Sequence, residues 1–147
     1  MTESIRKAAE ADLVRIAEIL VFNYRLNFYP IFKNDEFYFS ELTVPQTAEK
    51  LKPFVSEIWV YDDGAVKGFA HVKDGEVKKL FVEPVLYNSG TGSKLIEFAK
   101  ENCGAKFLWA LEKNEKAIRF YNRHGFYLTD ERKPEEDTAE FLVKMKL

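Results

Sequence analysis

The chain has 147 residues, 46% of them hydrophobic and 31% charged, with a formal net charge of −2 at pH 7. These values suit one globular domain with a sizeable core, and they disfavour a nucleic-acid partner, which usually requires a basic excess. The chain has one cysteine, no apolar run near the roughly 18 residues of a membrane span, and no apolar stretch of a signal peptide at its start. We therefore expect a single cytoplasmic domain over residues 1–147, with no nucleic-acid or membrane partner.

The first third of the chain predicts one strand and two helices. Residues 5–9 predict a short strand, and the apolar residues that follow recur with the period of an amphipathic helix over 12–27. Residues 28–43 have no clean period and predict a long loop with a partial helix. Pro45, which is tolerated in the first helical turn, predicts a second short helix as far as Lys52.

The middle of the chain predicts a three-stranded antiparallel meander. Asp-Gly pairs at 63–64 and 74–75 are strong signals for tight turns between strands. The third strand breaks its alternation between Val77 and Leu80, and either a single-residue bulge or burial on both faces would account for this. The predicted strands are residues 57–61, 65–72 and 76–82.

In the second half of the chain the apolar pattern alternates between helix and strand periods. The predicted elements are a helix over 90–103, a buried strand over 107–111 parallel to its predecessor, a helix over 115–124, and strands over 126–130 and 139–146. The charged segment 130–137 predicts a solvated loop between the last two strands. This order predicts an α/β fold, with a mixed central sheet of about seven strands and about four helices on both faces.

A glycine-rich segment, YNSGTGSK at 87–94, joins the third strand of the meander to the next helix. Gly90 and Gly92 permit a tight turn and the close approach of a ligand, and free N–H groups at a helix start favour an anion such as a pyrophosphate. A plain connection between the two elements is the alternative. The spacing matches neither the Walker loop nor the dinucleotide-binding fingerprint.

A second segment, NEKAIRFYNRHGF at 114–126, is compatible by itself with an ordinary helix. Asn114 would cap this helix and Gly125 would end it. This segment becomes informative only in combination with the glycine-rich segment and with the V-x-P sequence at 82–84.

Taken together, these segments resemble the GNAT acetyltransferase superfamily. In that family a strand ending in V-x-P precedes a turn of the form Q/R-x-x-G-x-G/A, and N-x-x-A-x-x-F-Y-x-x-x-G-F follows later. The resemblance covers roughly residues 4–146, and Tyr87 stands where the family usually has Gln or Arg. The matching residues are Val82, Pro84, Gly90, Gly92, Asn114, Ala117, Phe120, Tyr121, Gly125 and Phe126.

The resemblance implies a GNAT fold and acetyl-CoA as co-substrate. We expect no metal site, because His71 and His124 are the only histidines and neither has a Cys or Asp at a ligand-like spacing. The resemblance also implies that the strands at 77–82 and 107–111 splay apart and admit the pantetheine chain. The residues expected to contact acetyl-CoA are Leu80, Phe81 and Val82 along the pantetheine, Asn88, Ser89, Gly90, Thr91, Gly92 and Ser93 around the pyrophosphate, and Asn114 beside the pantetheine arm.

The same resemblance places Tyr121 near the sulfur, where its hydroxyl would protonate the leaving thiolate. Glu76 is the first candidate for the base that deprotonates the amine, with His71, Glu83 and an ordered water as alternatives. Cys103 lies on the apolar stripe of its helix, so we expect direct attack in a ternary complex rather than an acyl-cysteine intermediate.

An aromatic-rich stretch at 22–39 is expected to line the acceptor pocket, because this segment commonly borders the acceptor site in the family. The candidate substrate-binding residues are Phe28, Tyr29 and Phe32. Acidic residues among the aromatics would suit a cationic amine through charge attraction and cation–π contacts. The alternative is a satellite core beneath a long loop.

These observations predict an N-acetyltransferase that transfers acetyl from acetyl-CoA to a primary amine on a small molecule or a peptide. A non-catalytic coenzyme A-binding or regulatory module on the same fold is the alternative. A purely structural interaction protein fits less well, because a partner surface does not need the glycine turn. The acceptor's identity and the oligomeric state are open, with a homodimer among the alternatives.

Overall fold

The computed structural model describes residues 4–147, so the first three residues of the predicted domain lie outside the described part. A seven-stranded mixed sheet has the order β1-β2-β3-β4-β5-β7-β6, and within it β4 and β5 run parallel. The strands are β1 (Ile5–Lys7), β2 (Ile58–Asp62), β3 (Val66–Lys73), β4 (Glu76–Val82), β5 (Phe107–Leu111), β6 (Tyr127–Pro134) and β7 (Phe141–Lys146). The α-helices are α1 (Leu13–Asn23), α2 (Tyr29–Phe32), α3 (Val44–Leu51), α4 (Thr91–Asn102) and α5 (Glu115–Arg123).

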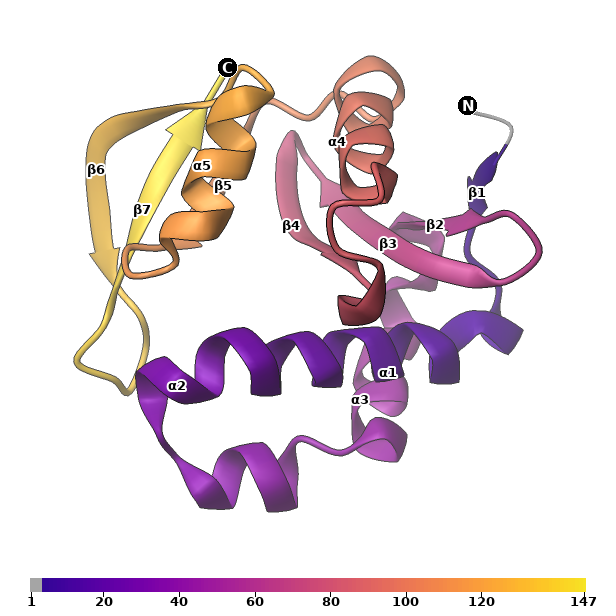
Figure 1. Ribbon diagram of the computed structural model, residues 1–147, viewed down its shortest axis with the longest axis horizontal. Coiled ribbons are helices and arrows are strands. Elements are labelled where there is room, and N and C mark those ends of the chain that lie inside the picture. Colours follow the sequence, from indigo (N-terminus) through magenta and orange to yellow (C-terminus); the bar gives the residue numbers. More distant parts are fainter. Residues whose placement is uncertain (1–3) are drawn as a thin grey trace.

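Helices cover both faces of the sheet, as predicted (Figure 1). One core cluster packs α1 and α3 against one face, and it includes Ile16, Leu20 and Phe69. A second cluster packs α4 and the end of α5 against the other face, and it includes Leu95 and Phe126. The described residues contain five α-helices, where about four were predicted.

The segment predicted as a long loop with a partial helix over 28–43 is mostly helical, which corrects the prediction. The first long helix continues from α1 through a π-helical turn, Tyr24–Phe28, into α2, and a second π-helical turn covers Phe37–Glu41. Apart from the exposed Phe39, the aromatic side chains of this stretch belong to or pack against the core cluster beneath α1. Burial of these rings therefore stabilises helical turns that the local periodicity does not predict.

The predicted solvated loop over 130–137 is also partly wrong, because β6 extends to Pro134. This strand lies at the edge of the sheet and most of its side chains are exposed, so charged residues are tolerated within it. Arg132 forms an ion pair with Glu112, 2.9 Å long, and its guanidinium lies 3.7 Å from the centre of the Phe141 ring.

The broken alternation in the third meander strand is caused by a bulge. His71 of β3 pairs with Lys79, but the next residue, Val72, pairs with Val77, so Lys78 is the extra residue. The bulge puts Val77 and Leu80 in contact with the same core cluster, as the first alternative predicted.

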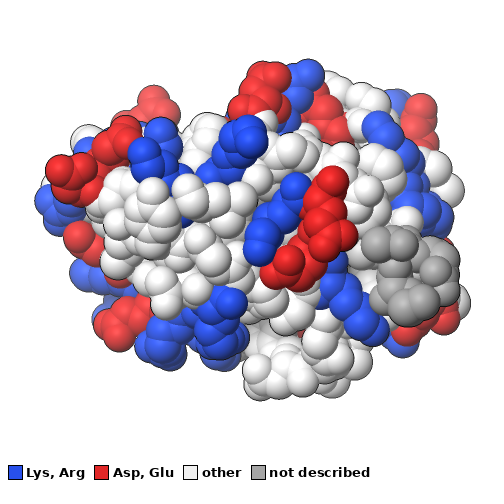
Figure 2. All heavy atoms as spheres, turned by 90° about the horizontal axis from the view of Figure 1, so that it is seen from above, with Lys and Arg blue, Asp and Glu red and all other residues white. Residues whose placement is uncertain are grey.

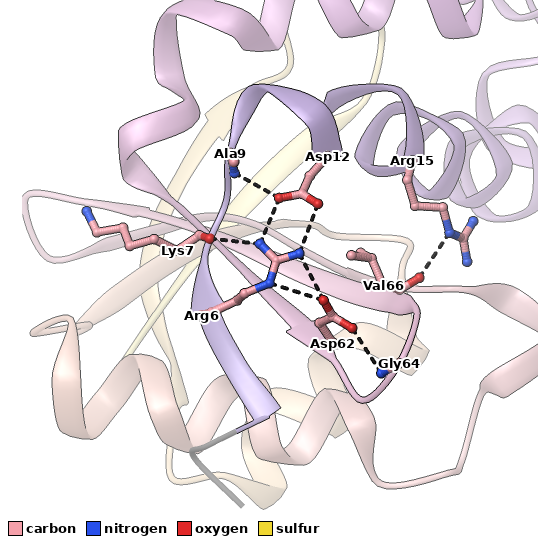
Figure 3. A network of polar contacts seen from close by, with 8 residues as sticks. All are labelled: Arg6, Lys7, Ala9, Asp12, Arg15, Asp62, Gly64 and Val66. Carbon is pink, nitrogen blue, oxygen red and sulfur yellow. Dashed lines mark hydrogen bonds and ion pairs between the residues drawn. The ribbon is translucent and has the colours of Figure 1, made fainter.

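An arginine network ties the start of the chain to the sheet (Figure 3). Arg6 on β1 forms ion pairs of 2.8 Å with Asp12, which lies just before α1, and of 2.9 Å with Asp62 at the end of β2. Asp62 also accepts a hydrogen bond from the backbone N–H of Gly64, 3.0 Å long. The network therefore links an edge strand, the first helix and the β2–β3 turn.

The described helices are all too short or too polar to span a lipid bilayer. On the face shown in Figure 2, basic and acidic side chains occur in short, interspersed groups.

Candidate functional site

A cleft of about 640 Å³ opens where the sheet divides between β4 and β5. The two strands pair only at Glu76–Phe107 and Val77–Leu108, directly before the bulge, and then diverge. Aromatic residues after α1, both diverging strands, the start of α5 and the β6–β7 loop line the cleft. The predicted splaying of these strands is thus present in the structure.

The edge of β4 that faces the cleft offers peptide groups for an extended ligand. The backbone N–H of Glu83 donates to the carbonyl of Lys67, 2.9 Å away. Because peptide groups alternate in direction along an antiparallel pair, those of Phe81 point toward β3, whereas those of Leu80 and Val82 point toward the cleft. The carbonyl of Val82 already accepts a hydrogen bond from Asn23, 2.8 Å long. Leu80 and the N–H of Val82 are therefore the groups at this edge that a ligand can use.

The glycine-rich segment forms an uncapped start of α4. Gly90 is the N-cap with φ of +91°, and no side chain caps the helix. The first intrahelical bond runs from the N–H of Lys94 to the carbonyl of Gly90, which leaves the N–H groups of Gly90 to Ser93 without partners among residues 4–147. A Cβ at Gly90 would meet no atom within 4 Å, so the turn faces open space. This arrangement fits a pyrophosphate, because unpaired N–H groups and the helix dipole both favour an anion.

Two residues of the predicted cradle have groups that are already engaged. The N–H of Ser89 donates to the carbonyl of Leu86, 3.2 Å away. The hydroxyl of Ser93 lies 3.1 Å from His124 Nε2, and His124 Nδ1 lies 2.7 Å from Glu97 Oε2. The Ser93 side chain therefore braces α4 against α5, and only its backbone N–H is left for a ligand.

Tyr87 packs against the core cluster beneath α4 and ties the glycine-rich segment to the first helix. Its hydroxyl donates to Asn23 Oδ1, and Asn27 Nδ2 donates to the Tyr87 hydroxyl over 3.0 Å. Asn23 is only 2% exposed and also bonds the carbonyl of Val82. The substitution of Tyr for the usual Gln or Arg is thus accommodated by two asparagines of the first helix. Sequence analysis missed Asn23, although a polar residue close to the apolar stripe of a helix was a usable signal.

Helix α5 places Asn114 and Tyr121 on the cleft wall. Asn114 caps the helix, with its side-chain oxygen accepting a hydrogen bond from the N–H of Ala117 over 3.3 Å. The Tyr121 ring packs between Phe120 and Phe126, and burial raises the pKa of its hydroxyl. The raised pKa keeps this hydroxyl protonated at neutral pH. Because the hydroxyl makes no hydrogen bond with any described residue, it is free to donate one to a ligand.

Among the three candidate bases, only Glu76 lines the cleft. Its carboxylate lies 3.4 Å from Lys78 Nζ. Glu83 forms a 2.7 Å ion pair with Arg15, and His71 Nε2 lies 2.8 Å from Glu57 Oε1, away from the cleft lining. The geometry therefore favours Glu76 over Glu83 and His71 as the base.

Two of the three predicted substrate-binding residues reach the cleft. Phe28 and Phe32 line it, but Tyr29 does not. The Tyr29 hydroxyl donates to Asp35 instead, and its ring packs on Tyr38 and Phe39. Besides Glu76, the acidic residues at the cleft come from the β6–β7 loop and are Glu135, Glu136 and Asp137.

None of these three carboxylates forms an ion pair with a described residue, so the cleft mouth carries free negative charge. Sequence analysis missed them, because the run of acidic residues was attributed to a solvated loop. The position of this loop over the cleft depends on the pairing of β6 with β7.

Cys103 lies beyond the last residue of α4 and does not line the cleft. Burial raises the pKa of its thiol, which makes the thiolate less available.

Comparisons with known proteins agree with this geometry. The family model for the "Acetyltransferase (GNAT) domain" matches residues 55–128. The peptidyl-lysine N-acetyltransferase YiaC of Escherichia coli is 31% identical over 74 residues, which are 49% of this chain and 51% of that protein. The chain thus aligns with about half the length of this curated relative.

Solved structures match over nearly the whole chain. The PaiA N-acetyltransferase of Thermoplasma acidophilum, in complex with coenzyme A, has a TM-score of 0.75 at 20% identity, covering 97% of this chain and 98% of that chain. YncA of Salmonella typhimurium, with its cofactor acetyl-CoA, has a TM-score of 0.65 at 22% identity, covering 97% and 91%. At these identities the likeness establishes the fold.

Proposed function

Because the chain belongs to the GNAT acetyltransferase family, we propose that it transfers the acetyl group of acetyl-CoA to a primary amine. The observation that carries this proposal is the cleft between β4 and β5. Tyr121 lies on the wall of this cleft, and the chain continues from β4 into the uncapped start of α4. The relative YiaC is named as acting on peptidyl-lysine. For this chain we propose a primary amine of a small molecule or a peptide as the acceptor.

The residues that would hold acetyl-CoA are those with polar groups that no other described residue engages. The N–H groups of Gly90 to Ser93 would bind the pyrophosphate. Leu80 and the N–H of Val82 would pair with the pantetheine, and the side-chain amide of Asn114 would contact the same arm.

The protein residues would handle two protons during the reaction. Acetyl-CoA supplies the acetyl group as a thioester. Glu76 accepts the proton that the attacking amine gives up, either directly or through a water. Tyr121 donates a proton to the sulfur as the C–N bond forms and the C–S bond breaks, and it is reprotonated from solvent.

We further propose that residues 1–147 act as one catalytic domain in the cytoplasm. Cys103 is the only cysteine, which agrees with a reducing compartment.

The proposal is tested by release of free coenzyme A from acetyl-CoA in the presence of a panel of amines, including a lysine peptide, a polyamine and amino acids. We expect release that depends on both components and a product heavier by one acetyl group. Binding of acetyl-CoA by calorimetry, with no amine raising thiol release, would instead identify a non-catalytic coenzyme A-binding module.

A further inference from the structure

A second pocket, of about 400 Å³, adjoins the cleft on the side of α1 and α3. The two hollows share Tyr24, Phe37, Lys78 and Lys79 in their linings and are therefore adjacent. The remaining lining residues of this second pocket are Leu20, Glu41, Leu42, Thr47, Lys50, Leu51, Phe54 and His71. Nothing in the proposed transfer reaction uses this pocket.

The wall of the second pocket carries an excess of positive charge. Three lysines, at 50, 78 and 79, face a single acidic residue, Glu41. Lys78 is paired with Glu76, but neither Lys50 nor Lys79 forms an ion pair with any residue in the described range 4–147. The pocket therefore holds two ammonium groups without an ion-pair partner, although Glu76 is near enough to Lys79 to oppose the lowering of its pKa.

Lys79 is the only one of the three lysines that is not exposed. It is partly buried on β4, and burial together with the neighbouring Lys78 lowers its pKa. Across the β3–β4 ladder it pairs with His71, so the two side chains are neighbours on one face of the sheet. The imidazole of His71 is 4% exposed, and burial lowers its pKa, so the neutral ring adds no positive charge. A desolvated ammonium without a counter-ion costs free energy that an incoming anion recovers.

The rest of the wall is apolar and aromatic. Leu20, Leu42 and Leu51 belong to the core cluster beneath α1, and the Phe54 ring lies 5.6 Å from the imidazole of His71. A ligand that fills this pocket would thus present hydrocarbon to most of the wall and one negative group to Lys79.

We propose that the second pocket binds the carboxylate and apolar body of the acceptor, which is therefore an amino acid-like amine with an apolar or aromatic side chain. The inference rests on the proposed function, in which the acceptor's amine lies in the cleft. The free carboxylates of Glu135, Glu136 and Asp137 attract the ammonium end at the cleft mouth, and Lys79 binds the opposite charge. The two sites together select a zwitterion over a simple amine.

The first experiment measures binding without turnover. Calorimetry with 3-phenylpropionate and its uncharged amide, 3-phenylpropanamide, isolates the carboxylate. We expect the acid to bind about tenfold or more tightly than the amide, as is typical for a hydrogen bond to a charged group. Lys79→Met should remove this preference while leaving the affinity for the amide within about twofold. Lys50→Met should have a smaller effect, because Lys50 lies on α3 and is exposed.

The second experiment compares acetyl transfer to L-phenylalanine and to L-phenylalaninamide. We expect a higher kcat/KM for the acid, although the amide has more free amine at neutral pH. Lys79→Met should abolish this preference without changing the KM for acetyl-CoA. Equal binding of the acid and the amide, or a preference that survives Lys79→Met, overturns the subsite. Preferential binding of the acid with no transfer to any amine supports the subsite and rejects the proposed transferase activity.

Discussion

At the scale of single residues, Tyr121 combines a raised pKa with a hydroxyl that no described residue engages. We predict that Tyr121→Phe lowers kcat by about 10²–10⁴, because the leaving sulfur loses its proton donor. The KM for acetyl-CoA should hardly change, since the ring still packs between Phe120 and Phe126. Steady-state kinetics of coenzyme A release measures both parameters.

Tyr29→Phe is the matched control for this prediction, because it removes a hydroxyl that binds Asp35 outside the cleft. Equal losses of kcat in the two variants would indicate a general effect on the fold and not proton donation by Tyr121.

Glu76 is the second residue whose role can be tested directly. Glu76→Gln should lower turnover at neutral pH and recover in part at high pH, where more of the acceptor amine is already unprotonated. A pH–rate profile of each protein measures this recovery. Glu83→Gln is the control, since Glu83 is paired with Arg15 and does not line the cleft. Parallel profiles for Glu76→Gln and wild type would remove Glu76 from the reaction.

Individual site residues were predictable where they belong to a local motif. Asn114 and Tyr121 line the cleft, and the start of α4 lies against α5, where a Cβ at Gly92 would come within 3.4 Å of the Phe120 ring. Asn23 and Lys79 were not predicted, because their roles arise from contacts between segments that are far apart in the sequence. Tyr29 was placed in the pocket with its neighbours, although the helical turn directs its ring elsewhere.

At the scale of secondary-structure elements, the start of α4 can be tested through Gly90. Its φ of +91° is costly for any residue with a Cβ, and the Cβ would project into the open space of the cradle. We predict that Gly90→Val weakens acetyl-CoA binding by at least tenfold and costs about 1–2 kcal/mol of stability. Calorimetry and thermal unfolding measure the two effects separately.

Gly104→Val is the matched control, because Gly104 follows the other end of α4, has φ of +68° and also faces open space. It should lower stability by a similar amount and leave the affinity for acetyl-CoA unchanged. An equal loss of affinity in both variants would mean that the helix as a whole, and not its first turn, determines binding.

The elements themselves were largely predictable, and the errors have a common cause. The meander, α4, β5 and α5 follow from strong periodicity and turn signals, and the bulge in β4 follows from a parity error within one strand. The helical turns at 28–41 and the extension of β6 to Pro134 depend instead on packing against the sheet and on pairing with β7. Local sequence patterns do not contain those tertiary contacts.

At the scale of the whole molecule, the Arg6 network joins an edge strand, the start of α1 and the β2–β3 turn (Figure 3). Its two acidic members have lowered pKa values. For Asp12 the main cause is the hydrogen bond from Arg6, and for Asp62 it is the backbone N–H of Gly64, followed by Arg6. A lowered pKa in the folded state stabilises the fold at pH values above the unfolded pKa, which is about 3.9 for aspartate. This contribution is lost as the pH falls through the folded pKa values.

We therefore predict that Arg6→Met lowers the free energy of unfolding at pH 7 by about 1 kcal/mol, a modest value because the Arg6 side chain is 43% exposed. The difference from wild type should begin to narrow as the pH falls below about 4, where the aspartates of the unfolded chain become protonated, and it should be lost as the pH passes the lowered folded-state pKa values of Asp12 and Asp62. Urea denaturation at a series of pH values measures it. Arg119→Met, which removes an exposed pair 3.9 Å long, should change stability much less. A difference that stays constant down to acidic pH would mean that Arg6 acts through the packing of its aliphatic stem and not through its charge.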